Sequence, residues 1–539
     1  MPTVSCLTNT GYHLNIFNII FKIMILHIAK KDFLDNFTSA RFVAGFLLCL
    51  FLVPFTVYTG TRLYESRVDK YQRDAREADE IFTKAQVYAQ IQPVAVIQPS
   101  PLTIFSKGIS EQVGSKASLS NSEIPTFATG ITTMYENQFL NRFVSLDFIN
   151  ILAIILSLIG VFLSYDIFSR EKEDGTLKLL LSNNVKRSDF FLGKVSGILL
   201  TFIPLLLVCY ILVFIILWIS PSVSLSADDY ARILLLFVFS LLYLSFFILL
   251  GSYISSKAGT SSTSLIINLF IWCFLLFLLP NSMSYLGKNI VKSDNYSIVR
   301  MNTMDLDNEF WKKYGELQKQ VKAETGMVYT NWNLCAGWNY GPVLLCFTTH
   351  DVMKYERRMH ELTAPMVLDY AGKKWHLQEV YLNQLFHQQK IVKYLSCLSP
   401  SEILKYVSSS LCKSDMENHV DFMNQARNYR EQFFNYYKEN KIFSSYNYFS
   451  PHKESEIPKT QEEAMKMVAQ WRSTAKPEST FDLSSLGFIS TAGLPRFTYN
   501  ERGIIDGLSD QLWIFAGLIS ACVVLIWITY SSLIKYDIR

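Results

Sequence analysis

The sequence predicts a mainly α-helical membrane protein that crosses the bilayer six times and carries a large, mostly helical extracytoplasmic domain with a smaller α/β insertion. Half of the 539 residues are apolar, and the mean hydropathy is +0.19. Six apolar runs are each long enough to cross a hydrocarbon core of about 30 Å. Six core helices of a soluble protein are the alternative, which the length and purity of the runs disfavour. The predicted spans are 42–60, 143–165, 195–219, 233–254, 262–280 and 512–534.

The distribution of basic residues predicts the orientation of these spans. The loop 166–194 carries six Lys and Arg residues, whereas the loop 220–230 carries none and contains Asp228 and Asp229. Short loops rich in Lys and Arg stay in the cytoplasm, so 166–194 is expected there. With six spans both termini are then cytoplasmic. Three basic residues directly after the first span point the other way, but they open a long segment, where the rule weakens.

These observations divide the chain into successive parts. We expect an N-terminal extension with an interfacial connecting helix (1–40), the first span (41–61), a first extracytoplasmic segment (62–142), the second span (143–165), a cytoplasmic loop (166–194), the third to fifth spans (195–281), a helical extracytoplasmic domain (282–511), and the last span with its tail (512–539). The net charge of +4 is small and no dense basic block occurs, so nucleic acid is not an expected partner.

The N-terminal run "NIFNIIFKIMILHIAKKDFLDNF" is apolar but interrupted by Lys22, His27, Lys30 and Lys31. It has no small-residue cleavage site, so an interfacial helix fits better than a signal peptide. A helix packed against the transmembrane bundle is equally compatible. A natural helix beginning follows Met24, and residues 1–23 are therefore expected to be an extension outside the folded core.

The extracytoplasmic segments contain clear helix and strand signals. A charged helix is expected over 64–90, and the prolines and β-branched residues of "IQPVAVIQPSPLTIFSKG" then indicate strands and turns. In "SPSEILKYVSSSL", Ser399 is expected to cap a helix, Pro400 to take its first position, and Glu402 to complete a capping box. The run beginning at Met416 forms another helix, whose apolar face contains Phe422, Ala426, Tyr429, Phe433 and Tyr436.

Four of the nine cysteines, Cys335, Cys346, Cys397 and Cys412, fall in the larger extracytoplasmic segment. One or two disulfides are expected there if the compartment is oxidising, with three possible full pairings. No C-x-x-C spacing occurs, so no metal site is predicted.

Two histidines in the same segment also fail to predict a metal site. His376 and His387 share a helix face with Glu379 and Asn383. Because three turns, about 16 Å, separate the histidines, a hydrated surface is expected.

The loop segment "SREKEDGTLKLLLS", residues 169–182, has an unusual pattern. Leu177, Leu180 and Leu181 share one helical face, while Gly175 can end the preceding helix. Acidic residues precede this face, and Ser188 is a candidate cap for the helix of the third span. A short helix with an apolar edge has nothing of its own to bury that edge against. We therefore expect it to enter a groove on another cytoplasmic protein, the alternative being a solvated charge run.

Several stretches resemble a known family. "REKEDGTLKLLLSNNVKRSDFFLGK" is similar to the first cytoplasmic loop of type-2 ABC exporter permeases, which contains the coupling helix. "IAKKDFLDNFTSARF" resembles the connecting helix of that family. "QPSPLTIFSKG" and "LSPSEILKYVSSSLCKSD" resemble outer-segment motifs of the subgroup with large extracytoplasmic loops, which includes permeases of the nitrous-oxide-reductase maturation and gliding-motility type.

The resemblance implies the type-2 ABC exporter permease fold, a bacterial inner-membrane location in contact with lipid, and two kinds of protein partner. These are a second permease half, identical or related, and cytoplasmic ABC ATPase subunits. No Gly-Lys pair in the chain is followed by Ser or Thr in a phosphate loop, so ATP and Mg are expected on the partner ATPase and no cofactor on this chain. The chain is therefore not expected to be an enzyme by itself.

The resemblance also implies roles for particular side chains. Leu177, Leu180 and Leu181 should fill the groove of the ATPase, Glu171 and Glu173 should orient the helix, and Gly175 should permit the break. The residues implied in ATPase coupling are Glu171, Glu173, Gly175, Thr176, Leu177, Leu180, Leu181 and Arg187. Within the spans, Asn150 and Asn268 are expected to line a path or to hydrogen-bond between helices.

Three functions remain open from the sequence. The first is the permease of an ATP-driven exporter. The second is a mechanochemical permease that moves its extracytoplasmic domain, and so acts on envelope proteins or lipids, without solute transport. The third is a membrane-anchored receptor or hydrolase, for which the sequence offers only the large domain itself.

Overall fold

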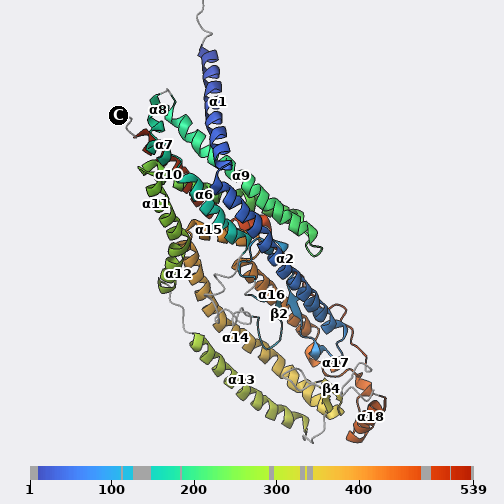
Figure 1. Ribbon diagram of the computed structural model, residues 1–539. Helices are drawn as coiled ribbons and strands as arrows, with labels where there is room; N and C mark the ends of the chain where they lie inside the picture. Colours follow the sequence, from blue (N-terminus) through green and yellow to red (C-terminus); the bar gives the residue numbers. More distant parts are fainter. Residues whose placement is uncertain are drawn as a thin grey trace, which may run out of the picture.

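The computed structural model describes residues 10–110, 113–125, 147–182, 185–290, 296–327, 334–336, 344–474, 487–509 and 511–535. Six helices or helical stretches in this part of the chain are long and apolar enough to cross a membrane (Figure 1). They are Ala40–Thr83, Phe148–Glu173, Arg187–Ile219, Ala227–Lys257, Ser261–Gly287 and Leu512–Ile534. The predicted polytopic, mainly α-helical class is therefore confirmed.

Helix α2 (Ala40–Thr83) combines the first span with the charged helix expected after it. The side chain of Ser39 accepts a hydrogen bond from the Phe42 amide and begins the helix. Near the predicted end of the span, Gly60 packs against Ile104. The helix continues through this point into the charged residues that follow. The two elements expected from the sequence are therefore one helix of 44 residues.

The second span consists of α5 (Phe148–Ile151), a π-helical turn (Leu152–Leu156) and α6 (Ser157–Ser164), with α7 (Ser169–Glu173) following. Asp147 caps its start by accepting a hydrogen bond from the Asn150 amide at 2.8 Å. The first residues of the predicted span, 143–146, lie outside the described residues.

Of the remaining spans, the fourth and fifth begin with side-chain caps, whereas the third and sixth do not. Helix α9 (Arg187–Ile219) follows Lys186, and Ser188 donates to Asp189 instead of capping, so the predicted cap is wrong. Helix α10 (Ala227–Lys257) starts at a capping box formed by Ser226 and Asp229. The last two spans comprise α11 (Ser261–Cys273), a π-helical turn (Phe274–Leu278), α12 (Leu279–Ile290) and α20 (Leu512–Ile534).

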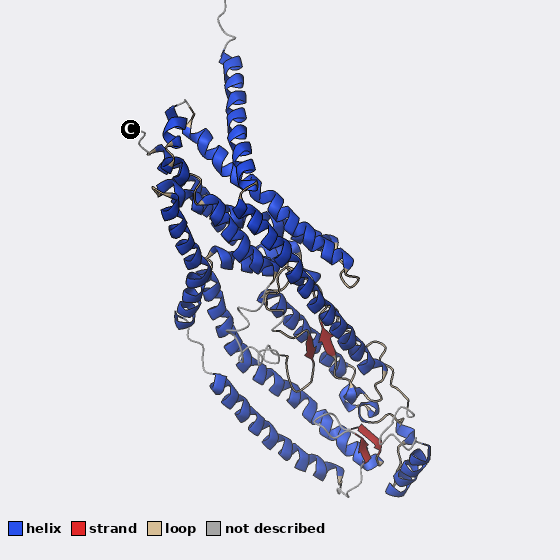
Figure 2. Ribbon diagram, viewed as in Figure 1, coloured by secondary structure: helices blue, strands red, loops and turns tan. Residues whose placement is uncertain are grey.

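A helical domain extends beyond one end of the bundle, and we call it the distal domain (Figure 1). It contains the far half of α2 and the helices α13, α14 and α16 to α18. The helix bounds are α13 Tyr296–Thr325, α14 His350–Ser396, α15 Pro400–Leu411, α16 Met416–Glu439, α17 Tyr446–Phe449, α18 Gln461–Thr474 and α19 Ile504–Ser509. Two short antiparallel sheets accompany them, β1 (Val94–Val96) with β2 (Lys116–Ser118) and β3 (Leu334–Ala336) with β4 (Leu344–Phe347) (Figure 2).

The distal domain has its own hydrophobic core around α16. Phe422, Ala426, Tyr429 and Phe433 are buried there, as the apolar face of this helix predicts. Tyr436, the fifth predicted residue, is only partly buried, and Tyr437 is buried in its place. Burial of this aromatic face accounts for a folded domain instead of a tether.

Helix α15 belongs to the core of the bundle and not to that of the distal domain. Its residues Ile403, Leu404 and Val407 are buried in the same cluster as the spans. The expected capping box is absent, because Ser399 donates to the carbonyl oxygen of Leu275 and Glu402 pairs with Lys405. Pro400 does occupy the first turn, as predicted.

The N-terminal helix α1 (Thr10–Phe37) packs against α9. A Cβ on Gly193 would clash with Ile28, and one on Gly197 with Asp32. This close packing supports the bundle-packed alternative for the connecting helix. The helix begins before Met24, and the side chains of residues 1–23 lie outside the described residues.

Candidate coupling site

The loop 166–194 lies at the end of the bundle opposite the distal domain, beside the end of α20 (Figure 1). We call this the loop end. Within the loop, α7 is followed by Gly175 and by α8 (Thr176–Ser182). The φ angle of Gly175 is +71°, in the left-handed region that favours glycine. Gly175 therefore stands at the helix break expected from the sequence.

A buried three-residue charge cluster joins the loop to two other helices. The Nζ atom of Lys194 lies 2.8 Å from Oε1 of Glu171 and 3.2 Å from Oδ1 of Asp32. The exposed fractions of the three side chains are 13, 20 and 11% for Lys194, Glu171 and Asp32. Ion pairs at such low exposure hold their geometry, because water screens them weakly. The cluster connects α7, the start of α9 and α1.

Two further charges of the loop hold the turn between α10 and α11. Lys172 donates to the carbonyl oxygens of Ser256 and Ala258, the latter at 3.3 Å. Glu173 accepts a hydrogen bond from the Ser261 amide at 3.0 Å. A cation at the end of one helix and an anion at the start of the next both match the helix dipoles.

The loop also contacts the first and last spans. Arg187 donates to the carbonyl oxygen of Leu533 at 2.8 Å and to that of Ile534, which satisfies acceptors at the end of α20. At the other side, Arg41 of α2 pairs with Asp166 at 2.9 Å. Segment 166–194 therefore makes polar contacts with α1, α2, α10, α11 and α20.

The predicted apolar edge of α8 faces its own bundle in part. Leu177 is 1% exposed and belongs to the core of the spans, and Leu180 packs against that core. The side chain of Leu181 lies outside the described residues. The expectation that Leu177 fills a partner's groove is therefore wrong for this conformation, because the bundle itself covers the edge. Among the described side chains of α8, Leu179, 65% exposed, is the large apolar one that points outward.

Glu171, Glu173, Thr176 and Arg187 likewise make contacts within the chain. Thr176 donates to the Glu171 carboxylate, and the other three side chains make the contacts given above. Sequence reasoning assigned them directly to the partner and missed Lys172, Lys194 and Asp32. The quoted motifs "REKED", "GK" and "IAKKD" contain these three residues, but no spacing rule joins positions so far apart.

Asn268 lies at a crossing of three spans. It is 1% exposed, and its Nδ2 donates to the Ser264 carbonyl oxygen at 3.0 Å within the same helix. A Cβ on neighbouring Gly251 would clash with Ser164 and lie 3.6 Å from Oδ1 of Asn268. This packing favours a helix-contact role over a path. Asn150 is partly buried, and its amide bonds to Asp147.

Single polar side chains within apolar runs join the spans, and the sequence offers no signal for them. Trp272 Nε1 donates to Ser157 Oγ at 2.9 Å, and the Tyr243 hydroxyl donates to the Ala153 carbonyl oxygen at 2.8 Å. Both contacts connect α10 or α11 to the second span, whose π-helical turn contains Ala153.

The predicted disulfides are not formed at two of the four cysteines. Cys397 and Cys412 are both free, and Cys412 is buried in the core cluster of the bundle. Cys397 lies at the end of α14 and Cys412 at the end of α15, so each is held by a different helix. The side chains of Cys335 and Cys346 lie outside the described residues.

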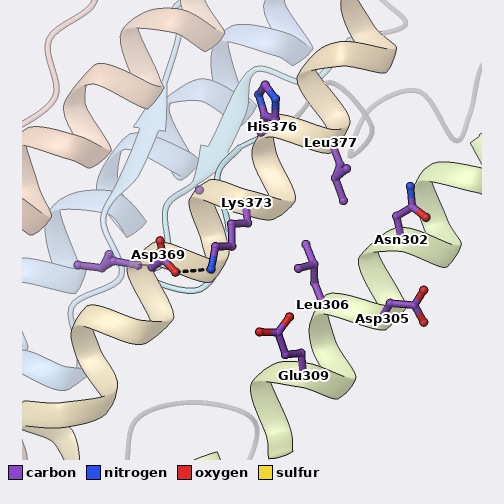
Figure 3. A pocket seen from close by; sticks show the side chains of 10 residues that line it. Asn302, Asp305, Leu306, Glu309, Asp369, Lys373, His376 and Leu377 are labelled. Atoms are coloured by element: carbon purple, nitrogen blue, oxygen red, sulfur yellow. Dashed lines mark ion pairs between the residues drawn. The ribbon is translucent and has the colours of Figure 1, made fainter. Parts of the chain in front are cut away.

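An open groove of about 740 Å³ lies between α13 and α14 of the distal domain (Figure 3). Its apolar lining includes Leu306 and Leu377, and Lys373 on its edge pairs with Asp369 at 2.8 Å. His376 is 76% exposed at the same groove, as a hydrated helix face predicts. In the described part of the chain, no three His, Cys, Asp or Glu side chains come together as a metal site.

Six apolar spans with one charged loop that contacts the ends of several of them define a polytopic membrane protein. The chain belongs to the ABC-2 family transporter proteins, whose family model matches residues 26–445. It is therefore a permease component of an ABC transporter, a membrane part that is not itself catalytic in this family. No curated protein sequence matches the chain.

Proposed function

We propose that this chain is the permease subunit of an ATP-driven exporter and that a separate cytoplasmic ATPase docks on the loop end. In this proposal the loop end and both termini are cytoplasmic, and the membrane is the inner membrane of a bacterium. ATP and Mg bind the ATPase, and this chain binds no cofactor. A second permease half, identical or related, completes the bundle.

The observation that carries the proposal is the set of contacts made by segment 166–194. Lys172, Glu173 and Arg187 bind the backbone ends of α10, α11 and α20, and Lys194 joins the loop to α1. A force applied to α7 and α8 therefore reaches four other helices through polar contacts, of which those of Lys172 and Lys194 are partly buried and that of Glu173 is exposed. A loop that only connected two spans would not need them.

The structure also supports revised roles for the loop residues. Glu171 and Glu173 position α7 through contacts within the chain, to Lys194 and to the Ser261 amide. The exposed Leu179, Lys178 and Arg170 form the surface available to an ATPase. Reversing a two-state equilibrium from 1:99 to 99:1 takes about 5.5 kcal/mol. Burying one leucine contributes about 1.5–3 kcal/mol, so the docked surface must include polar contacts beside Leu179.

The loosely covered faces of the fifth and sixth spans support a second permease half. Only 22% of the apolar window is buried inside the chain in each of Ser261–Gly287 and Leu512–Ile534. Phe270 and Trp527 are 73 and 66% exposed on these helices. Lipid and a second permease half are the partners we propose for these faces.

The test is a substitution on the outward side of α8. Leu179→Asp places a charge in the proposed ATPase contact, so at least tenfold less ATPase should copurify with the chain, and ATP hydrolysis by the purified complex should fall. The conservative control Leu179→Met retains the apolar contact and should retain both. Association unchanged in Leu179→Asp contradicts the docking surface, and a wild-type chain that binds no ATPase contradicts the function.

A mechanochemical permease is the second candidate, and one observation favours it. Helix α2 runs without interruption from the bundle into the distal domain over 44 residues. Its far half carries Asp74, which pairs with Lys116 of strand β2 at 3.2 Å. ATP-dependent motion of the distal domain in vesicles without solute flux would select this function over export.

A further inference from the structure

Two spans differ from the others in containing no proline and no π-helical turn. Pro54 and Pro204 lie inside α2 and α9, and π-helical turns interrupt the second and fifth spans at 152–156 and 274–278. Proline and π-helical turns are the usual causes of kinks. Helices α10 and α20, as described from Ala227 to Lys257 and from Leu512 to Ile534, contain neither.

These two helices pack against each other. The ring centroids of Phe239 and Phe515 lie 4.5 Å apart, and Phe239 is fully buried. The Gly251-Ser252 pair of α10 is a potential bend, but Gly251 is packed closely against Ser164. Helices α10 and α20 therefore form a stiff pair through the bundle.

At the loop end, polar contacts from 166–194 hold both members of the pair. Lys172 binds the carbonyl oxygens at the end of α10, and Arg187 binds those at the end of α20. The Ser255 hydroxyl of α10 also accepts hydrogen bonds from the amides of Phe168 and Ser169, each at 3.0 Å.

At the distal end, a second charge cluster holds the start of α10. Lys413, in the link between α15 and α16, is 11% exposed, and its Nζ lies 3.5 Å from Asp228 and 3.7 Å from Asp229. The same Nζ forms an ion pair with Glu501. One lysine therefore joins the distal domain, the segment that leads into α20, and the first turn of α10.

Arg232, one turn further along α10, reinforces this joint. Its guanidinium is 3% exposed and donates to the Arg502 carbonyl oxygen at 3.0 Å and to Asp228 at 2.7 Å. A third contact reaches the carbonyl oxygen of Leu411, at the end of α15, at 3.5 Å. All of the donors and acceptors are backbone or charged groups, which favours a fixed geometry.

The backbone at Lys413 is itself unusual. Its φ angle is +56°, in the left-handed region that a lysine rarely adopts. Neighbouring contacts hold it there, including the hydrogen bond from the Ile109 amide to the Ser414 carbonyl oxygen at 2.9 Å. Lys413 stands at the C-terminal cap of α15, where the Ser414 amide donates to the Ser409 carbonyl oxygen at 2.8 Å, so its backbone is fixed at this joint.

We propose that α10, paired with α20, is a transmission rod that passes movement of the loop end to the distal domain, with Lys413 as the positioning residue at its far joint. The inference rests on the proposed function, because it needs an ATPase to move the loop end. Asp228 and Ser256, at the two joints, lie about 42 Å apart along a straight helix. Because neither helix contains a proline or a π-helical turn to absorb displacement, movement at one end shifts the other.

The test measures distal movement in the purified complex with its ATPase. Spin labels at position 319 on α13 and position 219 at the distal end of α9 report the position of the distal domain relative to the bundle. Pulsed electron resonance is recorded with and without ATP and Mg. In the wild-type complex we expect the label separation to change on ATP binding.

Lys413→Asn removes the ion pairs of the lysine at the joint and keeps a residue type that tolerates positive φ. We expect the ATP-dependent change in label separation to fall by at least half, with ATPase association and hydrolysis within twofold of wild type. Lys441→Asn is a matched control, since Lys441 has a φ of +53° and an exposed side chain in the same domain. It should leave the change intact.

Glu501→Gln is a second variant with little risk to folding, because Glu501 is 55% exposed. It should reduce the separation change in the same direction but by less, and it decides the question if Lys413→Asn does not fold. If the folded variants show the full ATP-dependent change in label separation, the proposal that α10 is a transmission rod is wrong. So does a wild-type complex that hydrolyses ATP with no distal movement. A wild-type chain that binds no ATPase overturns the proposed function instead.

Discussion

The substitution Lys194→Met tests the charge cluster that joins the loop to α1. Methionine keeps most of the apolar stem of the lysine side chain but leaves the carboxylates of Glu171 and Asp32 without the cation between them. Both are largely buried, at 20 and 11% exposure. Removing one partner from a buried ion pair costs about 3–5 kcal/mol, because the remaining charge stays out of water.

The surroundings of Asp32 indicate a loss of unfolding free energy in the lower part of that range, and they make this loss depend on pH. Asp32 already has one buried carboxylate oxygen without a hydrogen-bond partner, and burial raises the pKa of Asp32 despite the opposing charge of Lys194. Without Lys194 this pKa rises further. A group whose pKa is higher in the folded state than in the unfolded state stabilises the fold at low pH and loses that contribution as the pH rises. The variant should therefore lose about 3 kcal/mol at pH 8 and less at pH 5.

The assay is thermal unfolding of the purified chain in detergent at both pH values, together with ATPase copurification. Lys194→Met combined with Asp32→Asn is the matched variant. It removes one positive and one negative charge of the cluster and should recover at least half of the lost stability. A loss below about 1 kcal/mol, equal at pH 5 and pH 8, would refute the reasoning that the cluster is buried and coupled.

Three more predictions follow from single residues. Leu177→Ala should destabilise the chain by about 2–5 kcal/mol in chemical unfolding, since it opens a cavity in the core, whereas an unchanged midpoint would return Leu177 to the partner-facing side. Gly175→Ala should lower the free energy of unfolding by about 1 kcal/mol. The cost comes from the positive φ alone, because nothing lies within 4 Å of the added Cβ. Gly175→Asn, measured by the same unfolding midpoint, should cost less. Burial lowers the pKa of His360 to about 4, so the distal domain should lose up to about 3 kcal/mol as the pH falls from 6.5 to 4, where only the unfolded state takes up the proton. His360→Phe should flatten this dependence in melting curves at pH 7.5 and pH 5, and a slope that persists would assign the effect to another group.

The six spans, the apolar face of α16 and the break at Gly175 could all be predicted from the sequence. Each depends on properties of a short run: enough apolar residues to cross a bilayer, apolar spacing along a helix, or one residue that accepts positive φ. The same local reasoning predicted a capping box at Ser399 and a cap at Ser188, and both predictions are wrong. The Ser399 hydroxyl donates to a carbonyl oxygen that is distant in the sequence, and α9 begins before Ser188.

The sequence by itself determined that this is a multi-span protein with a charged loop and a folded domain beyond the membrane, because hydrophobic length and helical periodicity act within a few turns. Only the tertiary structure decided what each charge of that loop holds. Leu177 faces the bundle, Arg187 ends α20 and Lys194 joins α1, because these partners lie far away along the chain and meet only when the helices pack.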